Sequence, residues 1–274
     1  MSGYIKGIDV SEHNGVIDWE KVKASGVGFA MLRGGYGQTV DKQFRRNASE
    51  CNRLGIPCGV YWFSYALNAV GAEREAACCL EVIQSFKIDY PVAFDLEYDS
   101  VKYAQKKRIY IGMSLASDMA REFCQAVRDA GYTAMNYANP DYLNRYFDAK
   151  VQREFPVWLA QWPNGTPSLD KPPRTCAIWQ YSEKGSVSGI SGPVDLDVCY
   201  GQYLNKEEKG NMTGEQIYNA LNAYLDTQPV PEWAKEELAV AEKLGITDGS
   251  APMRLIPRYQ AAIMAKRAAE KMKV

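Results

Sequence analysis

The sequence predicts an α/β protein: a modified TIM-like barrel with five βα units and three further strands, followed by a small helical C-terminal domain. First, short apolar segments alternate strictly with amphipathic segments up to about residue 147, which is typical of βα units around a parallel sheet. Second, three more apolar segments follow, joined only by loops rich in Gly, Pro and Ser. Five and three strands make eight, the number that closes such a barrel.

Each βα unit is predicted from a buried apolar strand and a helix with recognisable ends. Asp18 is suited to cap the first helix, and Gly55 is placed to end the second. Gly34 to Gly37 form a flexible segment after the second strand. The five strands are expected at residues 4–10, 26–33, 57–65, 91–97 and 132–137. The helices are expected to begin at Asp18 and then to span 41–54, 69–86, 102–130 and 140–147.

The last third of the chain sets the domain limits. The three further strands are predicted at residues 155–162, 176–181 and 193–197. We therefore assign residues 1–205 to the barrel, 206–212 to a charged linker and 213–274 to a C-terminal module. Its helices are expected at 214–225, 232–244 and 257–272. About 60 residues is small for a stable core, so this module is expected to pack on the barrel or to form a homodimer.

Composition excludes several functional classes. The net charge is −1, which does not favour nucleic acid or an anionic membrane as a partner. No segment is long and apolar enough for a membrane span. With one histidine, His13, and seven cysteines at irregular spacing, we expect reduced thiols, no metal site and no cofactor. Residues 1–7 lack the features of a signal peptide, so synthesis in the cytoplasm is expected.

Acidic side chains stand where predicted strands end. Asp95 and Glu97 follow the apolar run 91–96, and residues two apart in a strand share a face. Desolvation and a neighbouring negative charge both raise a carboxyl pKa, as paired carboxylates in glycoside hydrolysis require. The alternative is two solvated acids on a loop. Asp9 and Asp195 end the first and last strands, which barrel closure places side by side near the other two.

The order of these segments resembles glycoside hydrolase family 25, the Chalaropsis-type lysozymes that are common in bacteria and among phage endolysins. The resemblance runs from Tyr4 to about Leu204 and rests on five segments: Gly-Ile-Asp-Val-Ser at 7–11, Phe-Asp-Leu-Glu at 94–97, Trp-Leu-Ala-Gln at 158–161, Trp-Gln-Tyr at 179–181 and Val-Asp-Leu-Asp at 194–197. It implies a flattened eight-stranded barrel and cleavage of the β-1,4 bond between N-acetylmuramic acid and N-acetylglucosamine in peptidoglycan.

The resemblance also implies roles for the four acids. Glu97 matches the general acid that protonates the leaving oxygen. Asp95 either attacks the anomeric carbon or stabilises the substrate N-acetyl group as that group attacks, and we favour the second because both acids lie to one side of the sugar. That chemistry retains the anomeric configuration. Asp9 and Asp195 are expected to position the pair and tune the proton, or else to cap loops.

The expected substrate-binding residues are aromatic, with two polar additions. Arg33 stands where the family usually has lysine, and it is expected to contact a substrate carboxylate or one of the acids. Trp62 replaces a histidine usual in the family. His13 is interpreted as a turn residue. The aromatic candidates could equally be core residues; with Arg33 the substrate-binding set is Tyr61, Phe63, Tyr137, Trp158, Gln161 and Trp179.

Two alternatives to a muramidase stay open: a chitinase-like β-1,4-N-acetylglucosaminidase, and a non-catalytic barrel that binds cell walls. On the favoured interpretation the partner is the peptidoglycan of Gram-positive walls, reached after phage-type lysis or non-standard export. Residues 231–252 also resemble part of an S-layer-homology unit, which suggests a wall-binding or self-association module.

Overall fold

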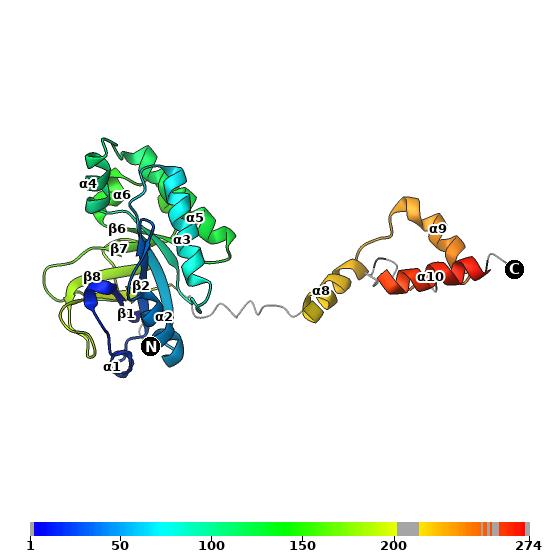
Figure 1. The fold of residues 1–274 in the computed structure, drawn as a ribbon, viewed down its shortest axis with the longest axis horizontal. Helices are drawn as coiled ribbons and strands as arrows, with labels where there is room; N and C mark the ends of the chain where they lie inside the picture. Colours follow the sequence, from blue (N-terminus) through cyan, green and yellow to red (C-terminus); the bar gives the residue numbers. More distant parts are fainter. Residues whose placement is uncertain (1–2, 202–213, 248, 251–252, 254–257, 272–274) are drawn as a thin grey trace. The chain divides into compact units, whose positions relative to one another are not determined.

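The computed structural model describes residues 3–201, 214–247, 249–250, 253 and 258–271 (Figure 1). The chain divides into two compact units, Met1–Lys206 and Glu207–Val274. This division falls one residue from the end of the predicted barrel domain. The predicted linker, 206–212, lies outside the described residues.

The first unit is a closed barrel, as predicted. The strands follow the order β1-β9-β8-β7-β6-β5-β4-β2, and the pairing of β1 with β2 closes the ring. A two-residue strand, β3 (Thr39–Val40), extends the sheet beyond β2. The barrel strands are β1 (Ile5–Val10), β2 (Phe29–Tyr36), β4 (Cys58–Phe63), β5 (Val92–Asp95), β6 (Ala134–Ala138), β7 (Val157–Ala160), β8 (Ile178–Gly185) and β9 (Val194–Cys199).

One strand of the closed barrel, β9, runs against the other seven. Neighbouring strands are parallel from β1 through β2, β4, β5, β6 and β7 to β8. In contrast, β9 is antiparallel to both β8 and β1. Parallel neighbours need a crossover connection, usually a helix, but antiparallel neighbours can be joined by a loop alone. The antiparallel direction of β9 therefore explains why β8 is followed by a Gly- and Ser-containing loop and not by a helix.

Helices follow the first five barrel strands, which confirms the five βα units. In Figure 1, α3 and α5 lie side by side. Asp18 caps α1 by accepting a hydrogen bond from the Lys21 N–H, and Gly55 ends α2 with φ 63°. The helices of this unit are a 3-10 turn η1 (Glu12–Asn14), α1 (Trp19–Ala24), α2 (Phe44–Leu54), α3 (Ala69–Ile83), α4 (Tyr98–Lys106), α5 (Met113–Asp129), α6 (Pro140–Arg145) and α7 (Ala149–Glu154).

Two local expectations were wrong. The single helix predicted at 102–130 is two helices, α4 and α5, separated at Arg108, whose φ is 62°. Ile111 is buried in this break, because the turn directs it into the core. The segment from Gly34 to Gly37, expected to be flexible, is ordered by strand pairing with β3. A side chain at Gly35 would collide with the Trp62 ring, 2.5 Å away.

Side chains fill both faces of the barrel wall. The outer cluster packs the strands against the helices and includes Trp19, Trp62 and Phe94. A separate inner cluster fills the barrel, and in it Phe29 and Tyr90 stack with ring centroids 4.5 Å apart. All seven cysteines lie among the described residues as free thiols.

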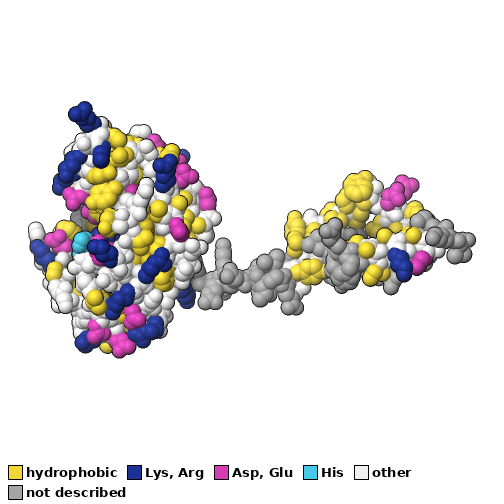
Figure 2. All heavy atoms as spheres, in the orientation of Figure 1, with side chains coloured by type: hydrophobic (Ala, Val, Ile, Leu, Met, Phe, Trp, Pro, Cys, Tyr) yellow, Lys and Arg dark blue, Asp and Glu magenta, His cyan; other side chains and the backbone are white. Residues whose placement is uncertain are grey.

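The second unit is helical, with α8 (Gly214–Asp226), α9 (Glu232–Lys243) and α10 (Arg258–Lys271) close to their predicted positions. Large apolar side chains remain on its surface, among them Trp233 at 81% exposure and Tyr224 at 61%. In Figure 2 hydrophobic side chains are visible on this unit beside residues that are not described. None of the helices in the described part of the chain is long and apolar enough to cross a membrane.

Candidate active site

A pocket of about 680 Å³ opens where β1, β4 and β5 end. Its lining includes nine of the eleven residues selected from the sequence: Asp9, Arg33, Tyr61, Phe63, Asp95, Glu97, Tyr137, Trp158 and Asp195. Strand register explains this convergence. Asp95 of β5 lies between Phe63 of β4 and Tyr137 of β6, and Asp9 of β1 lies opposite Asp195 of β9. Because β9 is antiparallel, Asp195 reaches this mouth from the start of its strand and not from its end.

Asp95 and Glu97 form the first carboxyl pair. Asp95 is the last residue of β5 and is buried, while Glu97 immediately precedes α4. The Glu97 N–H donates to Ser100 Oγ (3.2 Å), which fixes the backbone at the helix start. The two carboxyl groups are within hydrogen-bonding reach of each other, and this proximity contributes to the raised pKa of Asp95.

Asp9, Asp195 and Asp197 form a second carboxyl group cluster where β1 meets β9. The Asp9 carboxyl group lies within hydrogen-bonding reach of the carboxyl groups of both aspartates of β9. Asp9 Oδ2 also accepts a hydrogen bond from Gln180 Nε2 (2.8 Å). Asp197 is fully buried, and its Oδ1 accepts a hydrogen bond from Trp158 Nε1 (2.8 Å). The close approach of Asp195 and Asp197 raises the pKa of Asp9, because neighbouring negative charges disfavour its ionised form.

Burial dominates the electrostatics of the pocket. It raises the pKa of Glu97 to about 7, helped by the charge of Asp195 and opposed by the hydrogen bond with Asp95. Burial and the neighbouring Glu97 raise the pKa of Asp95 well above its usual range, although Arg33 acts in the opposite direction. Burial also raises the pKa of Asp195 to about 6 and that of Asp197 to about 8. The pKa of Asp9 is raised by burial and by both β9 aspartates.

Gln180 links the second cluster to the aromatic wall. Its Oε1 accepts hydrogen bonds from Tyr137 Oη (3.1 Å) and from Trp162 Nε1 (3.2 Å), while its amide donates to Asp9. Gln180 and Asp197 stand in the segments 179–181 and 194–197 but were not predicted as site residues. Trp162, half exposed after β7, was also missed. Its position as the aromatic last residue of the predicted strand 155–162 was the signal for Trp162; Gln180 had no such signal.

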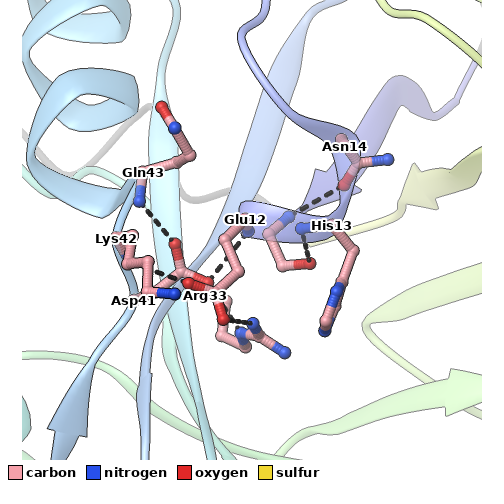
Figure 3. Close-up of polar contacts among 8 residues, drawn as sticks. Glu12, His13, Asn14, Arg33, Asp41, Lys42 and Gln43 are labelled. Carbon is pink, nitrogen blue, oxygen red and sulfur yellow. Dashed lines mark hydrogen bonds and ion pairs between the residues drawn. The ribbon is translucent and has the colours of Figure 1, made fainter.

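Arg33 is held by two carboxylates outside the predicted set (Figure 3). Its Nε donates to Asp41 Oδ2 (2.8 Å), and its Nη2 lies 3.3 Å from Glu12 Oε1. Asp41 also accepts the backbone N–H groups of Glu12 and Gln43, both at 2.9 Å. Arg33 therefore fastens the η1 turn to the start of α2. His13, expected to be only a turn residue, lines the pocket beside it.

Two of the predicted site residues, Gln161 and Trp179, do not line the pocket. Trp179 is buried in the outer cluster, where its Nε1 donates to the backbone carbonyl of Gln161 (2.7 Å). Neighbouring residues of a strand point to opposite faces, so Gln180 faces the interior and Trp179 faces away. The expectation that Trp179 stacks on a sugar was therefore wrong. Trp158 does face inward, but it is buried and packs edge-on against Tyr61 and Tyr137.

Within the described residues, no group of three or more His, Cys, Asp and Glu side chains is arranged to hold a metal ion. The clustered acids are in contact with one another and with hydrogen-bond donors. Their arrangement is suited to storing and delivering protons.

The comparison with protein families decides the classification. Residues 8–190 match the glycosyl hydrolases family 25, a span that includes Asp9, Asp95, Glu97 and Gln180 and ends just before β9.

The chain belongs to glycosyl hydrolase family 25.

Named family 25 relatives agree with this classification. The autolytic lysozyme of Clostridium acetobutylicum is 26% identical over 196 residues, which cover 70% of this chain and 55% of that protein. Lysozyme M1 of Streptomyces globisporus is 28% identical, over 70% of this chain and 66% of that protein. The chain thus spans only about half the length of the autolytic lysozyme.

Solved family 25 structures share the barrel. The modular autolysin LytC of Streptococcus pneumoniae, solved with a synthetic peptidoglycan ligand, is 30% identical, with a TM-score of 0.61 over 71% of this chain and 46% of that one. A family 25 hydrolase from Bacillus anthracis, at 24% identity, gives a TM-score of 0.60 over 74% of this chain and 92% of that one. The second likeness concerns the fold alone.

The buried acids of this family 25 barrel predict how its stability depends on pH. The pKa of Glu97 rises from the ordinary 4.5 to about 7 in the folded state, so between these values the folded chain binds more protons than the unfolded one. The free energy of unfolding should therefore fall as pH rises through this window. Glu97→Gln removes one acid with a raised pKa and should reduce this fall in the free energy of unfolding by roughly 1–3 kcal/mol.

Calorimetric melting at pH 5, 6, 7 and 8 measures this dependence. Glu122→Gln, at an exposed position of α5, is the matched control and should leave the dependence unchanged. Equal pH dependence in the wild type and in Glu97→Gln would show that Glu97 ionises as freely in the fold as in the unfolded chain.

Proposed function

We propose that this chain is a lysozyme-type N-acetylmuramidase. It hydrolyses the β-1,4 bond between N-acetylmuramic acid and N-acetylglucosamine in peptidoglycan. The observation that carries this proposal is the buried Asp95–Glu97 pair at the barrel mouth, with the pKa of Glu97 at about 7. A general acid is most effective when its pKa lies near the working pH, because it is then protonated and still able to release the proton.

The relatives support peptidoglycan as the substrate. Two of them are named as lysozymes, and LytC was solved with a synthetic peptidoglycan ligand. We extend this chemistry to the present chain because the family match contains three of its four candidate acids. The place of action in this proposal is the wall of Gram-positive bacteria, which the enzyme reaches after cell lysis or non-standard export.

In the proposed mechanism Glu97 donates its proton to the leaving oxygen of the scissile bond. The carboxyl groups of double-displacement enzymes usually flank the bond about 5–5.5 Å apart. Asp95 and Glu97 are instead within hydrogen-bonding reach, on one side of the pocket. This contact supports attack by the substrate N-acetyl group, with Asp95 orienting that group and stabilising the positive charge it develops.

Asp9 and Asp195 serve the pair as positioning residues in this proposal. The negative charge of Asp195 raises the pKa of Glu97 and so keeps the acid protonated. Asp9 is hydrogen-bonded to Asp195 and is itself held by Gln180. Tyr61, Phe63 and Tyr137, which all line the pocket, supply apolar surface for the sugar rings.

A cell-wall turbidity assay tests the proposal against its two alternatives. A muramidase clears suspensions of Gram-positive cell walls and leaves chitin intact. A chitinase-like enzyme would show the reverse preference, and a non-catalytic binding barrel would sediment with walls without clearing them.

Loss of the acid proton should abolish catalysis without unfolding the chain. Glu97→Gln keeps the side-chain shape and should lower kcat on soluble glycan chains about 10²–10⁴-fold. Asp95→Asn should lower it about 10²–10³-fold, because it removes charge stabilisation at the reacting centre. Melting temperature and the exposed variant Glu122→Gln are the controls. More than a tenth of wild-type activity in Glu97→Gln would rule out its role as the acid.

The stereochemical outcome follows from N-acetyl participation. Attack by this group inverts the anomeric carbon once, and water then inverts it again, so the first product should retain the β-configuration. Proton NMR recorded within the first minutes of hydrolysis distinguishes the two anomers. An α-anomer as the first product would exclude both roles considered for Asp95.

We further propose that the second unit binds the cell wall or a second copy of the chain. Its support is the exposed apolar surface that includes Trp233 and Tyr224 on separate helices. A wall contact made by a tethered module raises the effective concentration of the active site at its polymer.

Removal of the second unit should separate catalysis from targeting. A chain ending at Lys206 should hydrolyse soluble glycan chains at the wild-type rate but bind and clear intact cells about 10-fold or more slowly. In the full chain, Trp233→Ala is the corresponding point variant and should weaken pull-down with cell walls. Analytical ultracentrifugation of the truncated chain and of Trp233→Ala, beside the wild type, tests whether the second unit forms a homodimer. Clearance of cells at an unchanged rate after truncation would contradict a targeting role.

A further inference from the structure

A second cavity, of about 540 Å³, adjoins the active-site pocket. Asp99 and Lys102, in the first turns of α4, line both cavities, so the two are neighbours there. We call the second cavity the side groove. Its other principal lining residues are Tyr36, Gln38, Thr39, Tyr65, Tyr103 and Lys106.

The aromatic walls of the side groove are built in advance of any ligand. The rings of Tyr65 and Tyr103 meet edge to face with centroids 5.1 Å apart, and Tyr65 also packs on Phe63 of the active-site pocket at 5.2 Å. Buried Glu75 of α3 accepts the backbone N–H of Tyr65 at 2.8 Å and so fixes this turn. A groove of this volume with rigid aromatic walls is typical of a ligand site.

The side groove carries positive charge. Lys102 lies 3.0 Å from Asp99, but both side chains are more than two-thirds exposed, so this pair remains free to exchange partners. Lys106 has no carboxylate partner among the residues that the structure describes. In Figure 2 hydrophobic side chains bordered by Lys and Arg cover the region where Figure 1 places α4. An occupant with carboxylates would complement this surface.

An exposed strand edge completes the side groove. β3 is the last strand of the sheet, and its outer edge has no strand partner in the described part of the chain. Thr39 and Val40 are both exposed there. Such an edge offers backbone N–H and C=O groups to an extended peptide, whereas a glycan chain has no peptide backbone that could pair with them.

We propose that the side groove binds the stem peptide of peptidoglycan, the carboxylate-bearing peptide attached to the lactyl group of N-acetylmuramic acid. This inference rests on the proposed function, because the sugar that carries the peptide must occupy the active-site pocket. The peptide leaves the pocket past Lys102 and lies along β3, with its carboxylates toward Lys106 and its side chains against Tyr65 and Tyr103.

The test compares two soluble substrates for the full-length chain. One is a glycan of alternating N-acetylglucosamine and N-acetylmuramic acid with pentapeptide stems; the other is the same glycan after the stems are removed. Lys106→Gln and Tyr103→Ala should each raise KM for the peptide-bearing glycan about 3–10-fold and leave kcat unchanged. Neither should alter kcat/KM for the bare glycan. Lys150→Gln, an exposed lysine of α7 with the same change of charge, should affect neither substrate.

Two results would overturn the inference. An equal rise in KM on both substrates would mean that the groove holds sugar, and unchanged KM on both would mean that it holds nothing. If the wild type cleaves neither substrate, the proposed function fails separately. The side groove is then tested by calorimetric binding of both glycans to Glu97→Gln, with and without Lys106→Gln. Tighter binding of the peptide-bearing glycan, lost on Lys106→Gln, would support the inference. Equal binding of the two glycans would contradict it.

Discussion

The site depends on the insertion of β9 antiparallel between β8 and β1. This arrangement places Asp195 opposite Asp9 and Asp197 opposite both Gly7 and Gln180. Asp195 is the second residue of its strand. In a parallel strand it would lie at the far end of the barrel, away from Glu97. The reversal therefore brings a fourth acid to the mouth, beside Asp9, Asp95 and Glu97, and the charge of Asp195 contributes to the raised pKa of Glu97.

Such a concentration of acids works against folding. Burying an ionised carboxyl group costs several kcal/mol even after the protein relaxes, so burial favours the protonated forms of these acids. The opposing contribution comes from the apolar layer between strands and helices, where Trp19, Trp62 and Phe94 are completely covered. The barrel is in this sense a stable frame around a locally unfavourable charge arrangement, as expected where function and stability make different demands.

Much of the fold follows from local patterns, but orientation does not. Alternating apolar and amphipathic segments predict five βα units, and the two-residue spacing of Asp95 and Glu97 predicts their shared face. The break between α4 and α5 was missed because Ile111, Leu115 and Met119 recur every four residues, as on one face of a continuous helix. The orientation of Trp179 was predicted wrongly. Which of Trp179 and Gln180 faces the barrel interior depends on how β8 pairs with β7, and the sequence does not specify that pairing. Arg33 and Asp41 are eight residues apart, and only the pairing of β2 with β3 brings them together.

The interior of the barrel limits how a polymer can approach. Phe29 and Tyr90 stack inside it near the starts of β2 and β5, the end away from the carboxyl groups, and a side chain on Gly7 would lie only 2.3 Å from the Phe29 ring. The cylinder is thus plugged at its base, and nothing can thread through it. A polymer bound at this mouth has to lie across it with both ends free, so the proposed hydrolysis needs no chain terminus and suits a network whose ends are cross-linked or out of reach.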